Sequence, residues 1–487
     1  MAWKAAVFII GSQMLEKIAG LWVRAILLKF LIDGYHYNKA TAMTVLLIWD
    51  TASNITPIIG AVAADMYLGQ YKTKVREQHQ QKQRYDLYQQ LRPCSVTFGA
   101  NQFVRTYRSK EARKKAWEAY FNAYHTCIGA AFIVGIVAID VANRFRPITW
   151  FTASTVLMAF STAKFLLGSD LYVKDKGSPT VFSGMSVAIL AAIKKWRFRL
   201  PERTDDGVYH HLSGNKLSVP TNNLRFLNRA CLIGDRMDTT ASGPHDSNRG
   251  RLCTVDRVEQ LKSVIRIIPI CLSTFFLQLV DNQDMLLADV MDHNIHLGTF
   301  HLTVPQNLPV ILSMVVALLC TSTYDRWLAQ IFHRIAGNRR GHTIKHRIGA
   351  SLLFGTMAMA VSAVMERSTR ERHISVLWSL PQCVMGGLAD AVGVVAMMQF
   401  VYTELPKSLS SLGMSLTYIV AEVAYLVDFF LREGRGGKWL NNYYWWLLTA
   451  SGGINFAYFL WVSRAYGEEG QSVDWEAEVE EELSSAT

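Results

Sequence analysis

The sequence lacks the patterns by which most enzymes are recognised. It contains no nucleophile triad, no phosphate-binding loop and no cluster of metal ligands. Its seven cysteines show neither a zinc-type spacing nor a disulfide framework. They are scattered at Cys94, Cys127, Cys231, Cys253, Cys271, Cys320 and Cys383. We therefore expect no enzymatic activity, no cofactor and no bound metal.

Charged residues are also few, at 18% of the chain, whereas half of the residues are hydrophobic. A length of 487 residues would suit a soluble protein of two domains. However, apolar runs of about 20 residues or more recur between short polar loops, which is typical of a multi-pass membrane protein. The net charge of +11 could suggest nucleic acid binding, but the basic residues gather in loops, where they set topology. We expect the lipid bilayer as a partner, and no nucleic acid.

The apolar runs predict an all-α fold with about ten transmembrane helices. Four of them precede a long polar region and the others follow it. The expected spans are Ala5–Ile32, Thr41–Leu68, Trp117–Ala142, Thr149–Leu171, Val264–Leu287, Val304–Phe332, Ile348–Met365, Ile374–Tyr402, Leu409–Leu431 and Tyr443–Ala465. The first run is too long and too charged for a cleaved signal peptide.

The first apolar run carries charges in its middle, at Glu16, Lys17, Arg24 and Lys29. Gln13, Glu16 and Lys17 are spaced by three and four residues, so they share one helix face. A charge at mid-membrane costs about 2.5–3.5 kcal/mol, so such groups usually face a polar cavity or a partner helix. Two interpretations are open: a functional site, or charges that neutralise each other or snorkel to an interface.

The polar segments set the expected topology. Residues 174–262 are long and rich in Lys and Arg, so the positive-inside rule makes this linker cytoplasmic. Within it, Val181–Trp196 is apolar with a basic end and is interpreted as an interfacial helix, whereas Thr204–Gly250 is expected to be loop-like. Thr73–Gln90 is charged throughout and should lie outside the bilayer, and residues 467–487 form an acidic tail. An even number of spans then places both termini in the cytoplasm.

Several motifs occur in an order that resembles the plant nitrate/peptide transporter family. This family is a branch of the proton-coupled oligopeptide transporters in the major facilitator superfamily. The motifs are ITPIIGAVAADMYLGQYKT, RPCSVTFGANQF, RLCTVDRVEQLKSVIRIIPI, YDR, PQCVMGGLAD, LPKSLSSLG and WLNNYYWWLL. The resemblance covers nearly the whole chain and implies two six-helix bundles that rock around a central cavity.

The resemblance also implies a proton-coupling apparatus, from which this chain departs. The family's first-helix motif, E-x-x-E-R/K, reads Gln13-Met14-Leu15-Glu16-Lys17 here, so its leading acid is an amide. Arg92 stands before Pro93-Cys94 as the expected cation, Gln283 is kept on the seventh family helix, and Gln399 replaces a glutamate late on the tenth. Together these are the candidate site residues.

The largest departure is a gap. Relatives have a third helix and most of a fourth where this chain has only Thr73–Gln90. We therefore expect an incomplete N-terminal bundle over residues 1–173, the cytoplasmic linker over 174–262, a six-helix bundle over 263–466 and the tail.

Two functions follow from the resemblance. In the first, the chain transports a small polar solute such as nitrate, a peptide or an organic anion by alternating access. Lys17 and Arg92 would then bind the anion, and Glu16 would be the surviving proton-linked carboxylate, so proton coupling would be weakened. In the second, the chain is a non-transporting family remnant or membrane scaffold. We expect a plasma or vacuolar membrane, and the sequence leaves the oligomeric state open. His125, on an apolar span, is interpreted as a helix-contact residue and not as a ligand.

Overall fold

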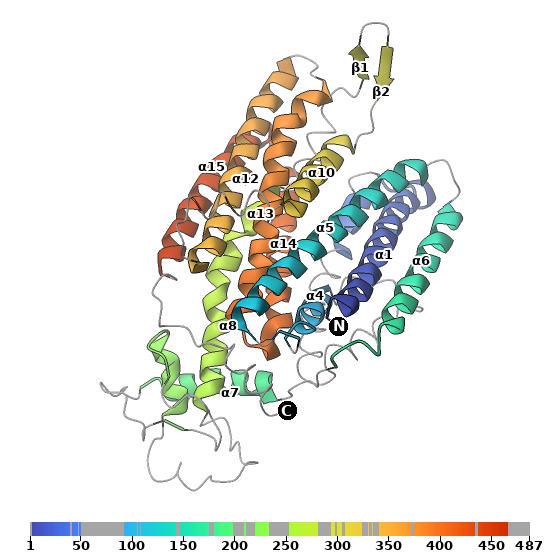
Figure 1. Ribbon diagram of the computed structural model, residues 1–487. Coiled ribbons are helices and arrows are strands. Elements are labelled where there is room, and N and C mark those ends of the chain that lie inside the picture. The colour runs from blue at the N-terminus through green and yellow to red at the C-terminus, as the bar shows by residue number, and fades with distance from the viewer. Residues whose placement is uncertain are drawn as a thin grey trace.

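The computed structural model is almost entirely helical (Figure 1). It describes residues 2–38, 41–46, 48–49, 92–104, 106–107, 109–142, 147–174, 180–197, 209–210, 220–232, 253–280, 294–297, 300–303, 307–323, 330, 334, 340–371, 375–433 and 437–465. The prediction of an almost wholly helical protein is confirmed for these residues. A short hairpin, β1 (Asn294–Leu297) with β2 (Phe300–Thr303), is an addition that the sequence did not predict.

In the described residues, the N-terminal half contains the α-helices α1 (Ala2–Lys29), α4 (Arg92–Asn101), α5 (Lys110–Ala142) and α6 (Pro147–Leu167). Figure 1 shows α1 between α5 and α6, and both of these helices contact it. Small residues allow the close approach. Ser161 of α6, for example, donates a hydrogen bond of 2.8 Å to the carbonyl of Ser12. Helix α1 ends in a five-residue π turn, Phe30–Gly34.

Six α-helices lie in the described residues of the C-terminal half. These are α8 (Val255–Ser273), α10 (Leu308–Ser322), α12 (Arg340–Glu371), α13 (Leu380–Glu404), α14 (Ser410–Glu433) and α15 (Gly437–Ala465). Helix α13 packs against α12 and α10, and α15 packs against α12. The largest buried apolar cluster draws on both halves, so the halves share one core.

Six helices in the described part of the chain are long and apolar enough to cross a membrane. They lie at Glu111–Ile139, Thr149–Leu167, Val255–Val280, Ile344–Ser368, Val376–Glu404 and Lys407–Leu431. Helix α1 is not among them, although it lies beside α5 and α6, and α10 is a shorter apolar helix than the predicted Val304–Phe332. Most of the predicted second span and all of Thr73–Gln90 lie outside the described residues.

The described part of the linker contains more regular structure than the sequence suggested. The predicted helix at Val181–Trp196 is present as α7 (Thr180–Lys194). Within the stretch expected to be loop-like, however, residues 220–232 fold around a short 3-10 helix, η4 (Arg225–Cys231), and pack with α7 and α8 into a buried apolar cluster. That expectation was wrong for this part, because composition alone did not reveal the apolar positions, such as Leu227 and Ala230, that the helices cover.

A buried polar network fastens η4 to α8. Both carboxylate oxygens of Glu259 accept hydrogen bonds from Thr221, from its backbone N–H at 2.9 Å and from its hydroxyl at 2.8 Å. The ammonium of Lys262 lies 2.6 Å from Glu259 and donates to the carbonyl of Thr221 at 2.8 Å. Each charge is therefore paired and hydrogen-bonded, which is the condition for tolerating buried charge. Helix α8 thus begins inside the linker and crosses the expected boundary at residue 263.

The linker thiols are shielded by the same packing. Burial raises the pKa of Cys231 to about 12 and that of Cys253 to about 11. Both thiols therefore stay protonated near neutral pH and are poor nucleophiles.

The lysine that follows α7 tests this folded linker. Lys195 is buried, and its ammonium donates a hydrogen bond of 2.7 Å to the carbonyl of Leu232. We expect Lys195→Met to weaken the linker by about 1.5–3 kcal/mol, because a charge-assisted bond to a buried carbonyl is lost. Limited proteolysis with proteinase K should then cut the linker several-fold faster. Lys194→Met, at the exposed neighbour, should leave the rate unchanged, and equal rates for the two variants would contradict the folded linker.

A glycine sets the distance between α10 and α13. A Cβ added at Gly387 would lie 2.4 Å from the backbone oxygen of Ser313, so the two helices touch through their backbones. We expect Gly387→Ala to destabilise the protein by about 1–3 kcal/mol through overpacking and to lower its melting temperature in detergent. Gly453→Ala is the matched control, because no atom lies within 4 Å of its added Cβ. A similar melting temperature for the two variants would refute the close contact.

Candidate functional site: the polar face of α1 and the contact between the halves

The predicted polar face of α1 exists. Gln13 donates a hydrogen bond of 2.6 Å from Nε2 to Oε2 of Glu16, and both side chains are buried. The ammonium of Lys17 lies 5.1 Å from the ring centroid of Phe132 on α5, within the range of a cation–π contact. The helical spacing therefore brings Gln13 and Glu16 together, and Lys17 reaches the neighbouring helix.

The other predicted site residues are placed less completely. Gln399 is buried on α13, in the opposite half, and its Oε1 has no hydrogen-bond partner among the described residues. Arg92 is the first residue of α4, but its side chain is not among those described, and Gln283 lies outside the described residues. The structure thus assembles Gln13 with Glu16 and does not test a meeting of all six residues.

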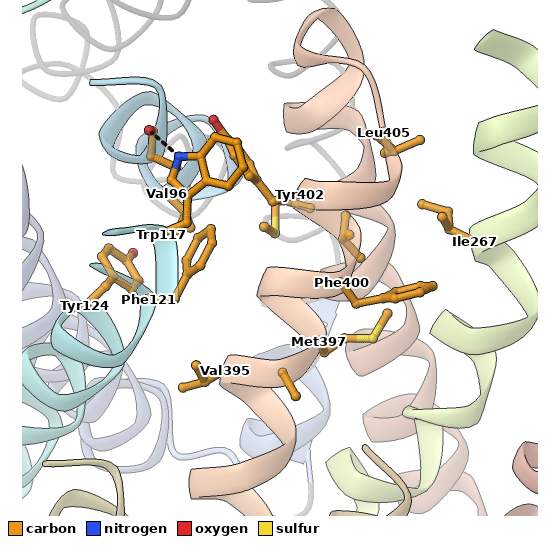
Figure 2. Close-up of a cluster of buried hydrophobic side chains, with 14 of the residues drawn as sticks. Val96, Trp117, Phe121, Tyr124, Ile267, Val395, Met397, Phe400, Tyr402 and Leu405 are labelled. Carbon is orange, nitrogen blue, oxygen red and sulfur yellow. Dashed lines mark hydrogen bonds between the residues drawn. The ribbon is translucent and has the colours of Figure 1, made fainter. Parts of the chain in front are cut away.

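The structure reveals a second polar group of residues where the two halves meet near the linker. Tyr402 of α13 donates a hydrogen bond of 2.5 Å to Oδ1 of Asn101 at the end of α4. Its ring is packed edge-to-face against Trp117 and Phe121 of α5, with centroids 5.0 and 5.7 Å away (Figure 2). The hydroxyls of Thr97 on α4 and Ser411 on α14 also share a hydrogen bond, at 3.0 Å. Aromatic packing and polar bonds therefore join the halves here.

An ion pair and a histidine–aspartate contact extend this contact along α5. Glu118 accepts a hydrogen bond of 3.0 Å from Arg347 of α12, whose side chain is only 1% exposed. His125 lies seven residues further along α5, which puts it on the same face two turns away. Its Nε2 is 3.4 Å from Oδ2 of Asp390 on α13. A glutamate and a histidine of the N-terminal half thus meet an arginine and an aspartate of the C-terminal half.

Sequence reasoning missed most of this contact. His125 was expected to touch another helix, and it does, but its acidic partner was not identified. The one available signal was the spacing of Glu118 and His125 on a single face of a mostly apolar helix. Such periodicity shows that two residues face the same way, but it does not show which helix they face.

Comparisons with known proteins place this geometry in context. The model of the POT family matches residues 90–431. The protein named NRT1/PTR FAMILY 1.2 of Arabidopsis thaliana is 29% identical over 542 residues, covering 94% of this chain and 89% of that protein. The protein named NRT1/PTR FAMILY 2.13 of the same plant is 27% identical, covering 95% of this chain and 87% of that protein. The first of these alignments is longer than the chain itself, so the relative has residues with no counterpart here.

Solved structures share the fold. An in meso crystal structure of the POT family transporter PepTSo superposes with a TM-score of 0.65 at 15% identity, over 95% of this chain and 98% of that one. A POT family transporter in complex with 5-aminolevulinic acid gives a TM-score of 0.61 at 11% identity, over 96% of this chain and 97% of that one.

Removing one hydroxyl tests the contact between the halves. Tyr402→Phe deletes the donor to Asn101 and leaves the aromatic packing in place. We expect a loss of about 1–2 kcal/mol, seen as a lower melting temperature in detergent, because a buried acceptor loses its donor. Tyr458→Phe is the control. Its hydroxyl makes a longer bond, 3.3 Å, to the carbonyl of Pro269 within the C-terminal half. A larger effect at Tyr458 than at Tyr402 would contradict the importance of the contact.

Proposed function

The chain belongs to the POT family of membrane transporters, and from this premise we propose the class of solute that it carries and a weak coupling of solute transport to protons. It is an integral, multi-pass membrane transporter and not an enzyme. The proposed cargo is a small anionic or zwitterionic solute: nitrate, a peptide or an organic anion. The proposed mechanism is alternating access, in which the N-terminal and C-terminal halves rock against each other.

The polar face of α1 supports this solute class. A lysine and a glutamate are held inside a membrane helix bundle together with an amide, and ionisable groups in such places mark solute and ion pathways. Lys17 is the proposed anion-binding cation, joined by Arg92. Solved structures of peptide or POT family transporters are in complex with 5-aminolevulinic acid, a thioalcohol-conjugated peptide and sulfate, which belong to the same chemical range.

Two amides support weak proton coupling. Gln13 and Gln399 occupy positions where the family resemblance implies acids, and an amide does not titrate in the physiological range. Glu16 is the one carboxylate left in this set. We therefore propose transport close to facilitated diffusion, driven by the solute gradient and, for an anion, by the membrane potential at about 2.3 kcal/mol per charge per 100 mV.

The alternative of a non-transporting remnant is not favoured. The family match and the relatives extend over both halves of the chain. Side-chain contacts also join the halves, from α4 and α5 on one side to α12, α13 and α14 on the other. These are the helices that would have to separate in a rocking cycle.

We also propose the placement in the cell. The protein would lie in the plasma or vacuolar membrane with its linker and both termini in the cytoplasm. Helix α7 would lie along the membrane surface. Its alanines at 188 and 191 are buried in the linker, whereas Ile193 and Trp196 are more than 60% exposed beside the exposed basic residues Lys194 and Arg197.

The test is nitrate uptake into vesicles that contain the purified full chain, with an imposed pH gradient and a clamped potential. We expect the native chain to equilibrate nitrate with little accumulation and Gln399→Glu to accumulate several-fold more, because the variant regains a titratable group. Gln382→Glu is the control, since it places an acid at another buried position of α13.

Strong proton-driven accumulation by the native chain would refute weak coupling. If neither the native chain nor Gln399→Glu takes up nitrate, a dipeptide or an organic acid, the result would favour the non-transporting remnant.

A further inference from the structure

The face of α5 that meets the C-terminal half carries a third polar side chain between its two cross-half contacts. Asn122 follows Glu118 by four residues and precedes His125 by three, so the three side chains share one helix face. Glu118 accepts a hydrogen bond of 3.0 Å from Arg347 of α12. His125 lies 3.4 Å from Asp390 of α13. Asn122 therefore lies within the contact that joins the halves.

The amide of Asn122 is buried and unsatisfied. The residue is 7% exposed, and neither its Nδ2 nor its Oδ1 makes a hydrogen bond to a described residue. A second asparagine in the contact between the halves differs in this respect, because Oδ1 of Asn101 accepts the hydrogen bond of Tyr402. The two amides should therefore act on the joined halves in opposite directions.

The opposing helices explain why Asn122 has no partner. Between residues 390 and 402, α13 carries apolar side chains and glycine except at Gln399. Val395 and Met397 from this stretch belong to the apolar core that both halves share. On α12, the hydroxyl of Ser351 already donates to the carbonyl of Ile348 at 2.8 Å. The surface opposite Asn122 is therefore mostly apolar.

We propose that Asn122 sets how readily the two halves separate. This inference rests on the proposed rocking of the halves and adds the residue that weakens their contact. In the joined state, the buried amide has lost its hydrogen bonds to water without replacing them from the described residues, which is unfavourable. In the separated state, water reaches the amide and satisfies it again. Asn122 thus favours separation, compared with an apolar residue at the same place.

The size of this effect is relevant to a transport cycle. An unsatisfied buried polar group shifts an equilibrium by about 5- to 150-fold. The hydrogen bonds of Tyr402 to Asn101 and of Thr97 with Ser411 act in the other direction and hold the halves together. Alternating access requires the halves to part in every cycle. Asn122 offsets part of the stabilisation that these bonds and the shared core supply.

The first test is thermal. We expect Asn122→Leu to raise the melting temperature of the purified full chain in detergent by about 2–4 °C, because a side chain of similar volume no longer buries an unsatisfied amide. Asn122→Met is a second apolar variant, in case the branched side chain does not fit. Asn101→Leu is the matched control and should lower the melting temperature, because Tyr402 loses its acceptor. A lower melting temperature in both Asn122→Leu and Asn122→Met would overturn the proposal.

The second test measures opening and needs no solute. Ser411 is buried in the contact between the halves, so the thiol of a Ser411→Cys variant reacts with a water-soluble maleimide when that contact opens. In this background we expect Asn122→Leu to slow the labelling, measured by mass spectrometry of the peptide, at least fivefold. Asn101→Leu should accelerate it. Replacing a residue that only stabilises the fold would accelerate labelling, so an unchanged or faster rate in Asn122→Leu would contradict the proposal.

The third test separates this inference from the proposed function. At saturating nitrate, we expect Asn122→Leu to exchange nitrate across vesicles several-fold more slowly than the native chain. If the native chain exchanges no nitrate while the labelling rates behave as expected, the solute assignment fails and the role of Asn122 in opening stands. If labelling slows in Asn122→Leu and nitrate exchange does not, the labelled opening is not a step of transport. The inference then fails, and the proposed transport stands.

Discussion

The structure depends on one constraint: a charge placed among membrane helices needs a partner of opposite charge or a donor of hydrogen bonds. Two pairs of titratable side chains join the halves, Glu118 with Arg347 and His125 with Asp390. Arg347 is almost completely buried, so an unpaired guanidinium there would be costly. The contact between the halves therefore combines these paired side chains with the apolar core that the halves share.

The linker obeys the same constraint outside the bundle. Glu259 and Lys262 are buried at the start of α8, and Thr221 satisfies both of them from a segment about 40 residues earlier in the chain. Met185 of α7 packs against both the linker cluster and the shared core of the bundle. The linker is thus attached to the first helix of the C-terminal half, and a change in its packing reaches that helix directly.

Sequence reasoning predicted most of the long helices in the described residues, because a run of about 20 apolar residues has few alternatives in a bilayer, but it missed α4 and made α10 too long. It also predicted that Gln13 and Glu16 would meet, since residues three apart share a helix face. It missed the pairing of Glu118 with Arg347, because those residues are 229 positions apart and the local sequence around each gives no indication of its partner. It missed the folded part of the linker for a related reason. The partners of Thr221 are Glu259 and Lys262, which are distant in the sequence, so the segment around Thr221 taken alone resembles a loop. Contacts within one helix follow from its period, whereas contacts between helices follow from the assembled bundle.

The glycine at position 387 has an evolutionary consequence. Where two side chains collide, a second substitution that shrinks the partner often restores the fit, and the two positions then vary together. The atom nearest to a Cβ at position 387 would be the main-chain carbonyl oxygen of Ser313, which every amino acid carries, ahead of the side chain of Val316. No substitution at position 313 removes this oxygen, so a second substitution there cannot relieve the clash caused by a larger residue at position 387. Relatives that keep α10 and α13 this close should therefore have glycine at this position, without covariation with position 313. At a side-chain contact, such as that of Gly129 with Leu318, the two positions can instead change together.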